Sequence, residues 1–437
     1  MLKEFQVHIN KRFSFLKNGK LLIAISGGID SVALTYLCKS LDLDFALAHC
    51  NFNLRGKESD ADEDFVLELA ELLDVEVFIQ KFDTEVYAKK YKRSIQMAAR
   101  ELRYDWFNEL AEQLEFDYIL TAHHADDNLE TFLINFTRGT GLNGLTGIPE
   151  INVNVVRPML QFSREQIEAY AKANHIKWQE DSSNTSRKYL RNKLRHEVVP
   201  ILKEINPQLL DSFQNTLEHL NDTADIVEES LNAVAKRAIV NIDEQGVTYK
   251  VAEFKKVNNP KAYLFEMLKD YGFTEWNDLV DLLNAETGKY IKSTSHRLIK
   301  HREFLILTDC HSEQDEASFV ISSFDEKVET PLGILCFAEA DAVLDNSKNT
   351  IYVDREQLNF PLELRLWQKE DVFCPFGMKG KKKLSKYLKD EKMSPVAKEN
   401  TWVLTTDNAI VWVVGKRADN RFRVTDNTKQ ILKIGLK

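Results

Sequence analysis

The chain has 437 residues, a formal net charge of −10 and a hydrophobic fraction of 43%. This length is too great for one compact core, so we expect two or three domains, and the acidic balance argues against a generic nucleic-acid coat. No apolar run is long enough to span a bilayer and the first residues lack a signal-peptide pattern, so we expect a cytoplasmic protein with no membrane partner.

The first predicted element is a short buried strand over 21–25, which runs into Ser-Gly-Gly-Ile-Asp-Ser at 26–31. Two glycines permit a tight turn, and the residues after them open a helix whose free backbone N–H groups attract phosphate. An ordinary turn is the alternative. The expected phosphate ligands are Ser26, Gly27, Gly28, Ile29, Asp30 and Ser31. The segment lacks the endings of the Walker and dinucleotide loops, and it resembles the pyrophosphate loop of the N-type ATP pyrophosphatases.

Short apolar runs alternate with amphipathic segments from residue 21 to about residue 174. The predicted strands cover 21–25, 45–49, 75–79, 118–122 and 153–156. This alternation is typical of an α/β domain in which helices cover both faces of a parallel sheet. Ligands bind outside the carboxyl ends of such strands, so the residues that follow each strand are candidate site residues.

Polar side chains follow the second and third predicted strands. His49 and Asn51 lie beside the predicted phosphate loop, where we expect nucleotide contact, and hydrogen bonding within their own loop is the alternative. Arg100 and Arg103 share one helix face at i,i+3, which suits a polyphosphate or a departing pyrophosphate. Pairing with acids of the same helix is the alternative there.

The fourth predicted strand leads into Thr-Ala-His-His-Ala-Asp-Asp-Asn-Leu-Glu-Thr at 121–131. A helix start favours acids for its dipole, which explains the carboxylates but not His123 and His124. Asp127 and Glu130 at i,i+3 suit either an ammonium group or a Mg²⁺ ion shared with phosphates.

Helices and a separate β-rich region are predicted further along the chain. A glycine-rich loop at 137–147, a helix from Ser163 and a basic helix that begins at Arg187 and ends near Pro200 come first. One apolar seam predicts a long helix over 208–240. Helices near 259–271 and 276–283, short strands to 308 and a linker at 310–318 follow, and later strands are predicted at 333–337, 350–353, 362–366, 402–405 and 409–414.

Two basic clusters interrupt the acidic chain, and a solvated helix face is the alternative for each. The first contains Arg187, Lys188, Arg191, Lys193 and Arg195, and the second contains Lys379, Lys381, Lys382, Lys383, Lys386 and Lys389. Such local concentrations of positive charge suit the phosphates of a nucleic acid.

The ordered motifs together resemble the tRNA(Ile)-lysidine synthetase family. The resemblance rests on residues 26–31, 49–55, 99–104, 121–131, 138–147, 157–160, 180–184 and 191–200, and on the basic segment 376–385. The segment 369–373, Lys-Glu-Asp-Val-Phe, departs from the family's Gly-Asp-Arg-Phe and lacks its arginine.

The resemblance implies a PP-loop ATP pyrophosphatase domain at 1–206, a helical tRNA-binding domain at 207–310 and a mostly β, α+β C-terminal tRNA-recognition domain at 319–437. It implies that L-lysine is ligated to the cytidine at the first position of the CAU anticodon of tRNA(Ile), through an adenylylated cytidine. That change converts the codon specificity from AUG to AUA. The implied co-substrate is ATP with Mg²⁺ near Asp30, and the oligomeric state, monomer or homodimer, stays open.

The resemblance also implies a role for each candidate residue. Residues 26–31, His49 and Asn51 would bind ATP, Arg100 and Arg103 would stabilise phosphate, Asp127 and Glu130 would bind or orient lysine, and His123 or His124 would accept a proton. The implied tRNA contacts are Arg191, Arg195, Lys379, Lys381, Lys382, Lys383 and Lys386.

Two other functions fit parts of the sequence. A tRNA thiolase shares the loop but needs a sulfur carrier, usually paired cysteines or an iron–sulfur cluster. Cys38, Cys50, Cys310, Cys336 and Cys374 are widely spaced and include no Cys-x-x-Cys pair, which argues against this reading. A nucleotide-binding sensor is the second rival, and it would bind ATP without releasing pyrophosphate.

Overall fold

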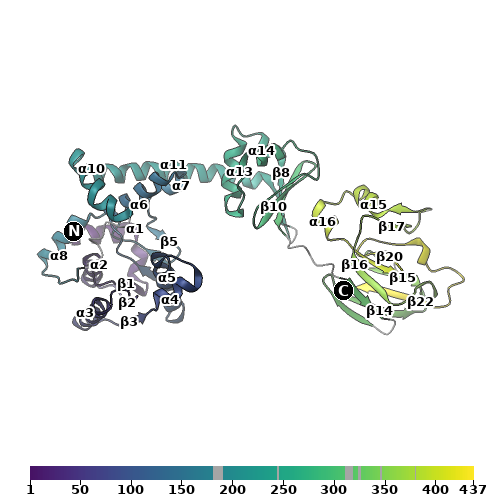
Figure 1. Ribbon diagram of the computed structural model, residues 1–437, viewed down its shortest axis with the longest axis horizontal. Helices are drawn as coiled ribbons and strands as arrows, with labels where there is room; N and C mark the ends of the chain where they lie inside the picture. The colour runs from purple at the N-terminus through teal and green to yellow at the C-terminus, as the bar shows by residue number, and fades with distance from the viewer. Residues whose placement is uncertain (181–189, 244–245, 311–317, 323–325, 345–346, 379) are drawn as a thin grey trace. The chain divides into compact units, whose positions relative to one another are not determined.

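The computed structural model describes residues 1–180, 190–243, 246–310, 318–322, 326–344, 347–378 and 380–437 (Figure 1). The chain divides into two compact units, Met1–Glu228 and Glu229–Lys437. None of the described helices is both long and apolar enough to cross a membrane. The expected site residues Arg187, Lys188 and Lys379, and most of the 180–184 motif, lie outside the described residues.

A six-stranded sheet in the order β3-β2-β1-β4-β6-β5 forms the centre of the first unit. Five strands run parallel: β1 Leu21–Ala24, β2 Phe45–Asn51, β3 Val77–Lys81, β4 Tyr118–Leu120 and β6 Val155–Val156. The edge strand β5 Ile151–Asn152 pairs antiparallel with β6. The prediction of one strand over 153–156 is therefore wrong at its start, because Val153 adopts φ 56° and turns the chain back as a hairpin.

Alternate residues of β1 point to opposite faces, which gives the sheet two cores. Leu21 and Ile23 pack in the core formed with α1 Leu2–Arg12, α2 Ile29–Ser40, α3 Lys57–Leu73 and α8 Arg164–Ala173. Leu22 lies in the opposite core with Phe107 and Ala111 of α5 Ile95–Gln113. Helices thus cover both faces, and the predicted α/β domain is confirmed.

The remaining elements of the first unit follow the sheet or connect its strands. They are the 3₁₀ turn η1 Ser14–Lys17, α4 Thr84–Tyr91, α6 Ala125–Arg138, α7 Leu142–Leu145, α9 Leu190–Lys193, the π-helical turn Leu194–Val198 and α10 Val199–Ile205. The basic helix does not end near Pro200 as predicted. Pro200 lies in the first turn of α10, where its missing N–H breaks no helical hydrogen bond, and the helix continues to Ile205.

The long helix α11 Leu209–Ala238 matches the predicted apolar seam in extent. Phe213 and Leu217 are buried near its start, and Val234 and Ala238 are buried near its end. Its middle is exposed, including Ile226 at 68%. The seam is therefore buried at two places only, one in each unit.

An antiparallel sheet in the order β7-β8-β11-β10-β9 follows this helix in the second unit. Its strands are β7 Ile239–Asp243, β8 Gly246–Lys250, β9 Tyr290–Lys292, β10 His296–His301 and β11 Phe304–Asp309. Three helices share its core, α12 Val251–Lys255, α13 Pro260–Leu268 and α14 Trp276–Leu282. The short turn η4 Lys269–Tyr271 extends α13. The predicted helices are confirmed. β7 was missed because it begins where the seam predicts the end of the long helix, whereas β8 lies beyond that helix in a stretch for which no strand was predicted.

Two antiparallel sheets share a core around Trp412 in the rest of the second unit. One contains β12 Ser318–Ile321, β16 Leu362–Leu366, β19 Trp402–Thr406, β20 Ala409–Val413 and β21 Arg417–Ala418. The other contains β13 Lys327–Thr330, β14 Gly333–Ala340, β22 Ile431–Leu436 and β15 Thr350–Asp354. The ribbon β17 Val372–Phe373 with β18 Lys382–Lys383, the helices α15 Leu384–Asp390 and α16 Pro395–Glu399, and the turns η5 Arg355–Gln357 and η6 Asn420–Phe422 complete it. The predicted β-rich region is confirmed.

Candidate functional site

A pocket of about 660 Å³ opens in the first unit outside the carboxyl ends of β1, β2 and β4. Its lining brings together Ser26, Asp30, Ser31, His49, Asn51, Arg100, Arg103, His123, Asp127 and Arg191. Of the other expected residues in the described part of this unit, Gly27, Gly28, Ile29, His124, Glu130 and Arg195 are not among the lining residues. Residues from five separate segments therefore converge where the parallel sheet predicts a ligand.

The loop between β1 and α2 is held in shape by a serine side chain. Ser31 Oγ donates to the carbonyl of Gly28 at 2.9 Å and accepts from the backbone N–H of Ser26 at 3.2 Å. Gly27 has φ +86°, a conformation that residues with a side chain rarely adopt. The Ile29 side chain is buried in the core, so only the backbone of this residue is available to phosphate. The first turn of α2 supplies the unpaired N–H groups.

His49 and Asn51 form internal hydrogen bonds while they line the pocket. His49 Nδ1 lies 2.9 Å from the carbonyl of Ile25, and a carbonyl only accepts, so Nδ1 carries the proton and Nε2 is the acceptor. Burial lowers the pKa of His49, which keeps the ring neutral. Asn51 donates to Glu63 Oε2 at 2.7 Å. The predicted alternative, hydrogen bonding within their own loop, holds only for Asn51, whose Oδ1 accepts the N–H of Asn53 at 3.0 Å, because the partner of His49 belongs to the segment after β1.

Two guanidinium groups of α5 line the pocket without a carboxylate partner. Arg100 lies over the ring of Tyr104 at 4.8 Å, and Arg103 lies over the ring of Phe52 at 5.2 Å. Neither forms an ion pair with any residue that the structure describes, and Glu101 pairs with a different arginine. Stacking on aromatic faces leaves the guanidinium N–H donors free for an anion.

His123 lines the pocket as a neutral imidazole. Its Nδ1 lies 2.9 Å from Thr121 Oγ1. Burial lowers the pKa of His123 to about 4, and the nearby Arg157 adds to this shift, while Asp127 opposes it. A neutral ring at neutral pH is able to accept a proton.

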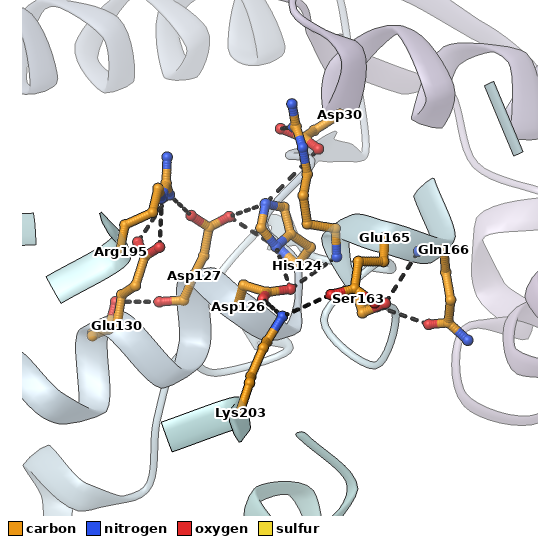
Figure 2. Close-up of polar contacts among 12 residues, drawn as sticks. Asp30, His124, Asp126, Asp127, Glu130, Ser163, Glu165, Gln166, Arg195 and Lys203 are labelled. Carbon is orange, nitrogen blue, oxygen red and sulfur yellow. Dashed lines mark hydrogen bonds and ion pairs between the residues drawn. The ribbon is translucent and has the colours of Figure 1, made fainter. Parts of the chain in front are cut away.

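His124 is buried at 4% exposure and lies among carboxylates (Figure 2). Its Nε2 is 3.3 Å from Asp127 Oδ2 and 3.8 Å from Asp30 Oδ1, and its Nδ1 is 3.7 Å from Asp126 Oδ2. The two adjacent histidines thus have different surroundings. His123 lines the pocket, whereas His124 does not line it and contacts the carboxylates of Asp30, Asp126 and Asp127.

The carboxylates of Asp127 and Glu130 are paired with two arginines, of which Figure 2 labels Arg195. Arg191 Nε lies 2.8 Å from Glu130 Oε2, and Arg195 Nε lies 2.6 Å from Glu130 Oε1. Both arginines also reach Asp127 Oδ1, at 3.4 and 3.2 Å. Burial acts to raise the pKa of Asp127, but His124 and the arginines outweigh it and the pKa is lowered. The expected ammonium site therefore holds guanidinium groups, and a solvated helix face is excluded for this pair of arginines.

The two carboxylate oxygens of Asp30 have different partners. Its Oδ2 pairs with the guanidinium of Arg164, whereas its buried Oδ1 has no hydrogen-bond partner in the described part of the chain. No group of three or more His, Cys, Asp or Glu side chains arranged for a metal occurs among the described residues. Mg²⁺ at a nucleotide site is usually bound through one or two carboxylates together with substrate phosphates, so a single oxygen without a hydrogen bond at Asp30 fits such an ion.

Two features of this site were missed from the sequence. Arg164 lies in the first turn of α8, where a positive charge opposes the helix dipole, and that placement was the available signal. Arg55 pairs with Asp62 at 2.6 Å, and both residues line the pocket. The ion pair between Arg55 and Asp62 could not be predicted from their spacing, because Arg55 lies in the loop before α3 and Asp62 lies within that helix.

The basic segment of the second unit combines free and paired lysines. Lys381, Lys383 and Lys386 are exposed. Lys382 instead pairs with Asp390 at 2.9 Å and lies 5.6 Å from the ring of Tyr387. In the turn at 369–373, which lacks the arginine of the family's motif, the buried Arg365 donates two hydrogen bonds to the carboxylate of Asp371, at 2.8 and 3.0 Å. This pair of bonds fixes the shape of the turn without that arginine.

Three family models match the chain. A PP-loop domain matches residues 1–202, a TilS substrate binding domain matches 242–310, and a TilS substrate C-terminal domain matches 362–434. The tRNA(Ile)-lysidine synthase of Parabacteroides distasonis is 40% identical over 99% of both chains. That of Bacteroides thetaiotaomicron is 39% identical over 97% of both, and that of Porphyromonas gingivalis is 34% identical over 96% of this chain and 94% of its own.

Proposed function

Since the chain belongs to the tRNA(Ile)-lysidine synthase family, we propose that its pocket joins lysine to the first anticodon cytidine of tRNA(Ile) at the expense of ATP. The chain is an ATP-dependent ligase that forms lysidine on tRNA(Ile). The observation that carries the proposal for the pocket is the convergence of the loop at 26–31, two unpaired arginines, a neutral histidine and Asp127 on one cavity.

The chemistry requires that the oxygen at C2 of cytosine become a leaving group. The oxygen attacks the α-phosphate of ATP, pyrophosphate departs, and the lysine amine then displaces AMP at C2. Negative charge develops on the leaving pyrophosphate, where the N–H groups of the loop and the free donors of Arg100 and Arg103 stabilise it. Mg²⁺ bound with ATP would neutralise phosphate charge, and Asp30 is the residue that would hold it.

Lysine enters as a cation, and the acidic pair Asp127 and Glu130 is the group that we assign to its α-ammonium. Because Arg191 and Arg195 occupy these carboxylates, lysine has to take their place. The guanidinium groups that it releases then become available to RNA phosphate. The attacking amine must lose a proton first, and we assign its acceptance to His123 or His124, the two histidines that follow β4.

We assign three working parts along the sequence. Residues 1–206 carry the chemistry, 207–310 bind tRNA, and 319–437 recognise it through Lys381, Lys383 and Lys386, to which we add Lys379 from the sequence. The bases of an anticodon loop are accessible without opening a duplex. tRNA and ATP meet in the cytoplasm, where we place the reaction.

Pyrophosphate release separates this proposal from a sensor. We expect pyrophosphate and an AMP-linked tRNA when the protein receives ATP and tRNA(Ile), and free AMP once lysine is added. A protein that binds ATP yet releases no pyrophosphate with both substrates present would be a sensor. Sulfur transfer is disfavoured because burial raises the pKa of the pocket thiol Cys50 to about 12, so it is not a thiolate at neutral pH.

A further inference from the structure

The turn at 375–378 in the second unit exposes an aromatic side chain. Phe376 is 44% exposed and Met378 is 46% exposed, although the preceding Pro375 is buried. The N–H of Met378 donates to the carbonyl of Pro375 at 2.9 Å, and Gly377 has φ +81°. These are the features of a β-turn that needs glycine at its third position, with Phe376 at its second.

A fully buried carboxylate, that of Asp419, holds the residue before this turn through a hydrogen bond. Asp419 is 0% exposed, accepts the N–H of Cys374 at 2.8 Å and pairs with Arg421 at 2.8 Å. The N–H of Phe376 donates to the carbonyl of Ala418 at 2.9 Å. A turn that is already ordered loses little conformational entropy when a ligand contacts its tip.

Two exposed cations belong to strands that are hydrogen-bonded to this turn or to the strand before it. β17, which precedes it, pairs with β18, where Lys383 is exposed, and Phe376 itself bonds to β21, where Arg417 is exposed. Neither Lys383 nor Arg417 forms an ion pair within the described ranges. An exposed aromatic ring on a turn whose neighbouring strands carry exposed cations complements a ligand with a flat apolar face and negative charge, and an unpaired nucleotide of RNA has both.

We propose that Phe376 is a stacking platform for an unpaired base of the tRNA, with Lys383 and Arg417 on the phosphates beside that base. The choice of tRNA rests on the proposed function, and the stacking contact adds to the purely electrostatic role of the lysines. Loss of one stacked base weakens binding about 5- to 150-fold, so Phe376→Ala raises the Kd for tRNA(Ile) within this range.

The test measures tRNA binding by the full-length protein across a salt series. Phe376→Ala weakens binding without changing the slope of log Kd against log salt, because no charge is removed, whereas Phe376→Tyr restores affinity. Lys383→Gln combined with Arg417→Gln lowers that slope by about 1.4 to 1.8. Leu344→Ala is the matched control, since Leu344 is an 83% exposed apolar residue of the same unit outside this turn, and it leaves the Kd unchanged.

Fluorescence of Phe376→Trp identifies the partner without any reaction. Single-stranded RNA quenches the added tryptophan, and a duplex of equal length does so less. Equal quenching by both, unchanged tRNA affinity of Phe376→Ala, or a response only to anionic lipid vesicles overturns the proposal. Failure of the wild-type protein to form lysidine would instead count against the proposed function, because the quenching needs neither ATP nor lysine.

Discussion

Glu130 of α6 lies between two guanidinium groups of the segment at 190–198, with Nε of Arg195 2.6 Å from its Oε1 and Nε of Arg191 2.8 Å from its Oε2. The Glu130 side chain is 2% exposed and the side chains of Arg191 and Arg195 are 39% and 34% exposed, so these contacts are partly buried ion pairs. They tie the acidic helix start to a basic segment about sixty residues later in the sequence. Any lysine bound at Glu130 therefore competes with the protein's own cations.

Glu130→Gln is expected to raise the lysine concentration needed for ligation while adenylylation of the cytidine continues. AMP-linked tRNA then accumulates at low lysine, because the α-ammonium has lost its anchor. Quantifying AMP-linked tRNA against lysine concentration checks this. If adenylylation itself fails and added Mg²⁺ restores it, Glu130 is a metal ligand and our assignment is wrong.

The same variant is expected to lower the free energy of unfolding by about 2–3 kcal/mol, because it removes the charge between two arginines that are about a third exposed. Chemical denaturation measures this loss. Glu168→Gln is the matched control, since Glu168 forms an exposed i,i+4 pair with Lys172 and should cost less than about 0.5 kcal/mol. Equal losses in the two variants would contradict a partly buried ion pair at Glu130.

Asp30→Ala is expected to abolish pyrophosphate release while the fold persists. The variant loses the oxygen without a hydrogen bond that we assign to Mg²⁺ and frees Arg164, but the core contacts of α2 are unchanged. Pyrophosphate release and thermal unfolding, measured together, separate the two effects. Wild-type turnover in a folded Asp30→Ala protein would remove Asp30 from the mechanism.

The pKa of His123, about 4 in the folded protein, lies below the ordinary value of 6.5. The unfolded chain therefore binds more protons between these values, and the stability contributed by the neutral ring is lost as the pH falls from about 6.5 to about 4. His123→Gln removes this dependence, so the wild-type free energy of unfolding should fall more steeply over that range, by up to about 1.4 kcal/mol per pH unit. Parallel curves for the two proteins would show that His123 titrates normally.

Neutralising Lys381 and Lys383 together is expected to weaken tRNA binding and flatten its salt dependence by about 1.4 to 1.8 units of slope. Lys382→Gln alone should change tRNA binding much less, because Lys382 already pairs with Asp390. Filter binding at several salt concentrations tests both, with ATP affinity as the control. If Lys382→Gln weakened tRNA binding as much as the double neutralisation of Lys381 and Lys383, the ion pair with Asp390 would not restrain Lys382.

Replacing the four partly buried cysteines by serine and the fully buried Cys38 by alanine is expected to leave substantial activity. Alanine is chosen for Cys38 because a hydroxyl in the core of α2 would lack a partner. Lysidine yield per folded protein is the measurement. Complete loss of activity traced to a single thiol in a folded variant would revive the sulfur-transfer alternative.

The sequence predicted the ends of β1, β2, β3 and β4 to within two residues, because buried parallel strands are continuous apolar runs, and residues that follow β1, β2 and β4 line the pocket. Arg100 and Arg103 lie in the pocket as their i,i+3 spacing predicts. The pairing of Arg191 and Arg195 with Glu130 was not predictable, because local spacing carries no information about contacts across about sixty residues.

The strands β7 and β8 were missed for a related reason. The predicted helix overlaps the start of β7, and the strand conformation of β7 and β8 depends on their pairing with each other and on the pairing of β8 with β11, which comes much later in the chain. His123 and His124 are adjacent in the sequence, yet one borders the pocket and the other is buried among carboxylates. Their different surroundings follow from the packing of α6 and not from residue type.

Mass analysis of the nucleosides of tRNA(Ile) tests the central claim most directly, after the transcript is incubated with the protein, ATP and lysine. The account predicts that the cytidine at the first anticodon position is replaced by a nucleoside that carries lysine, and that omission of ATP or lysine prevents this. Unchanged cytidine with all substrates present and the protein folded, or a nucleoside that has gained sulfur, would contradict the account.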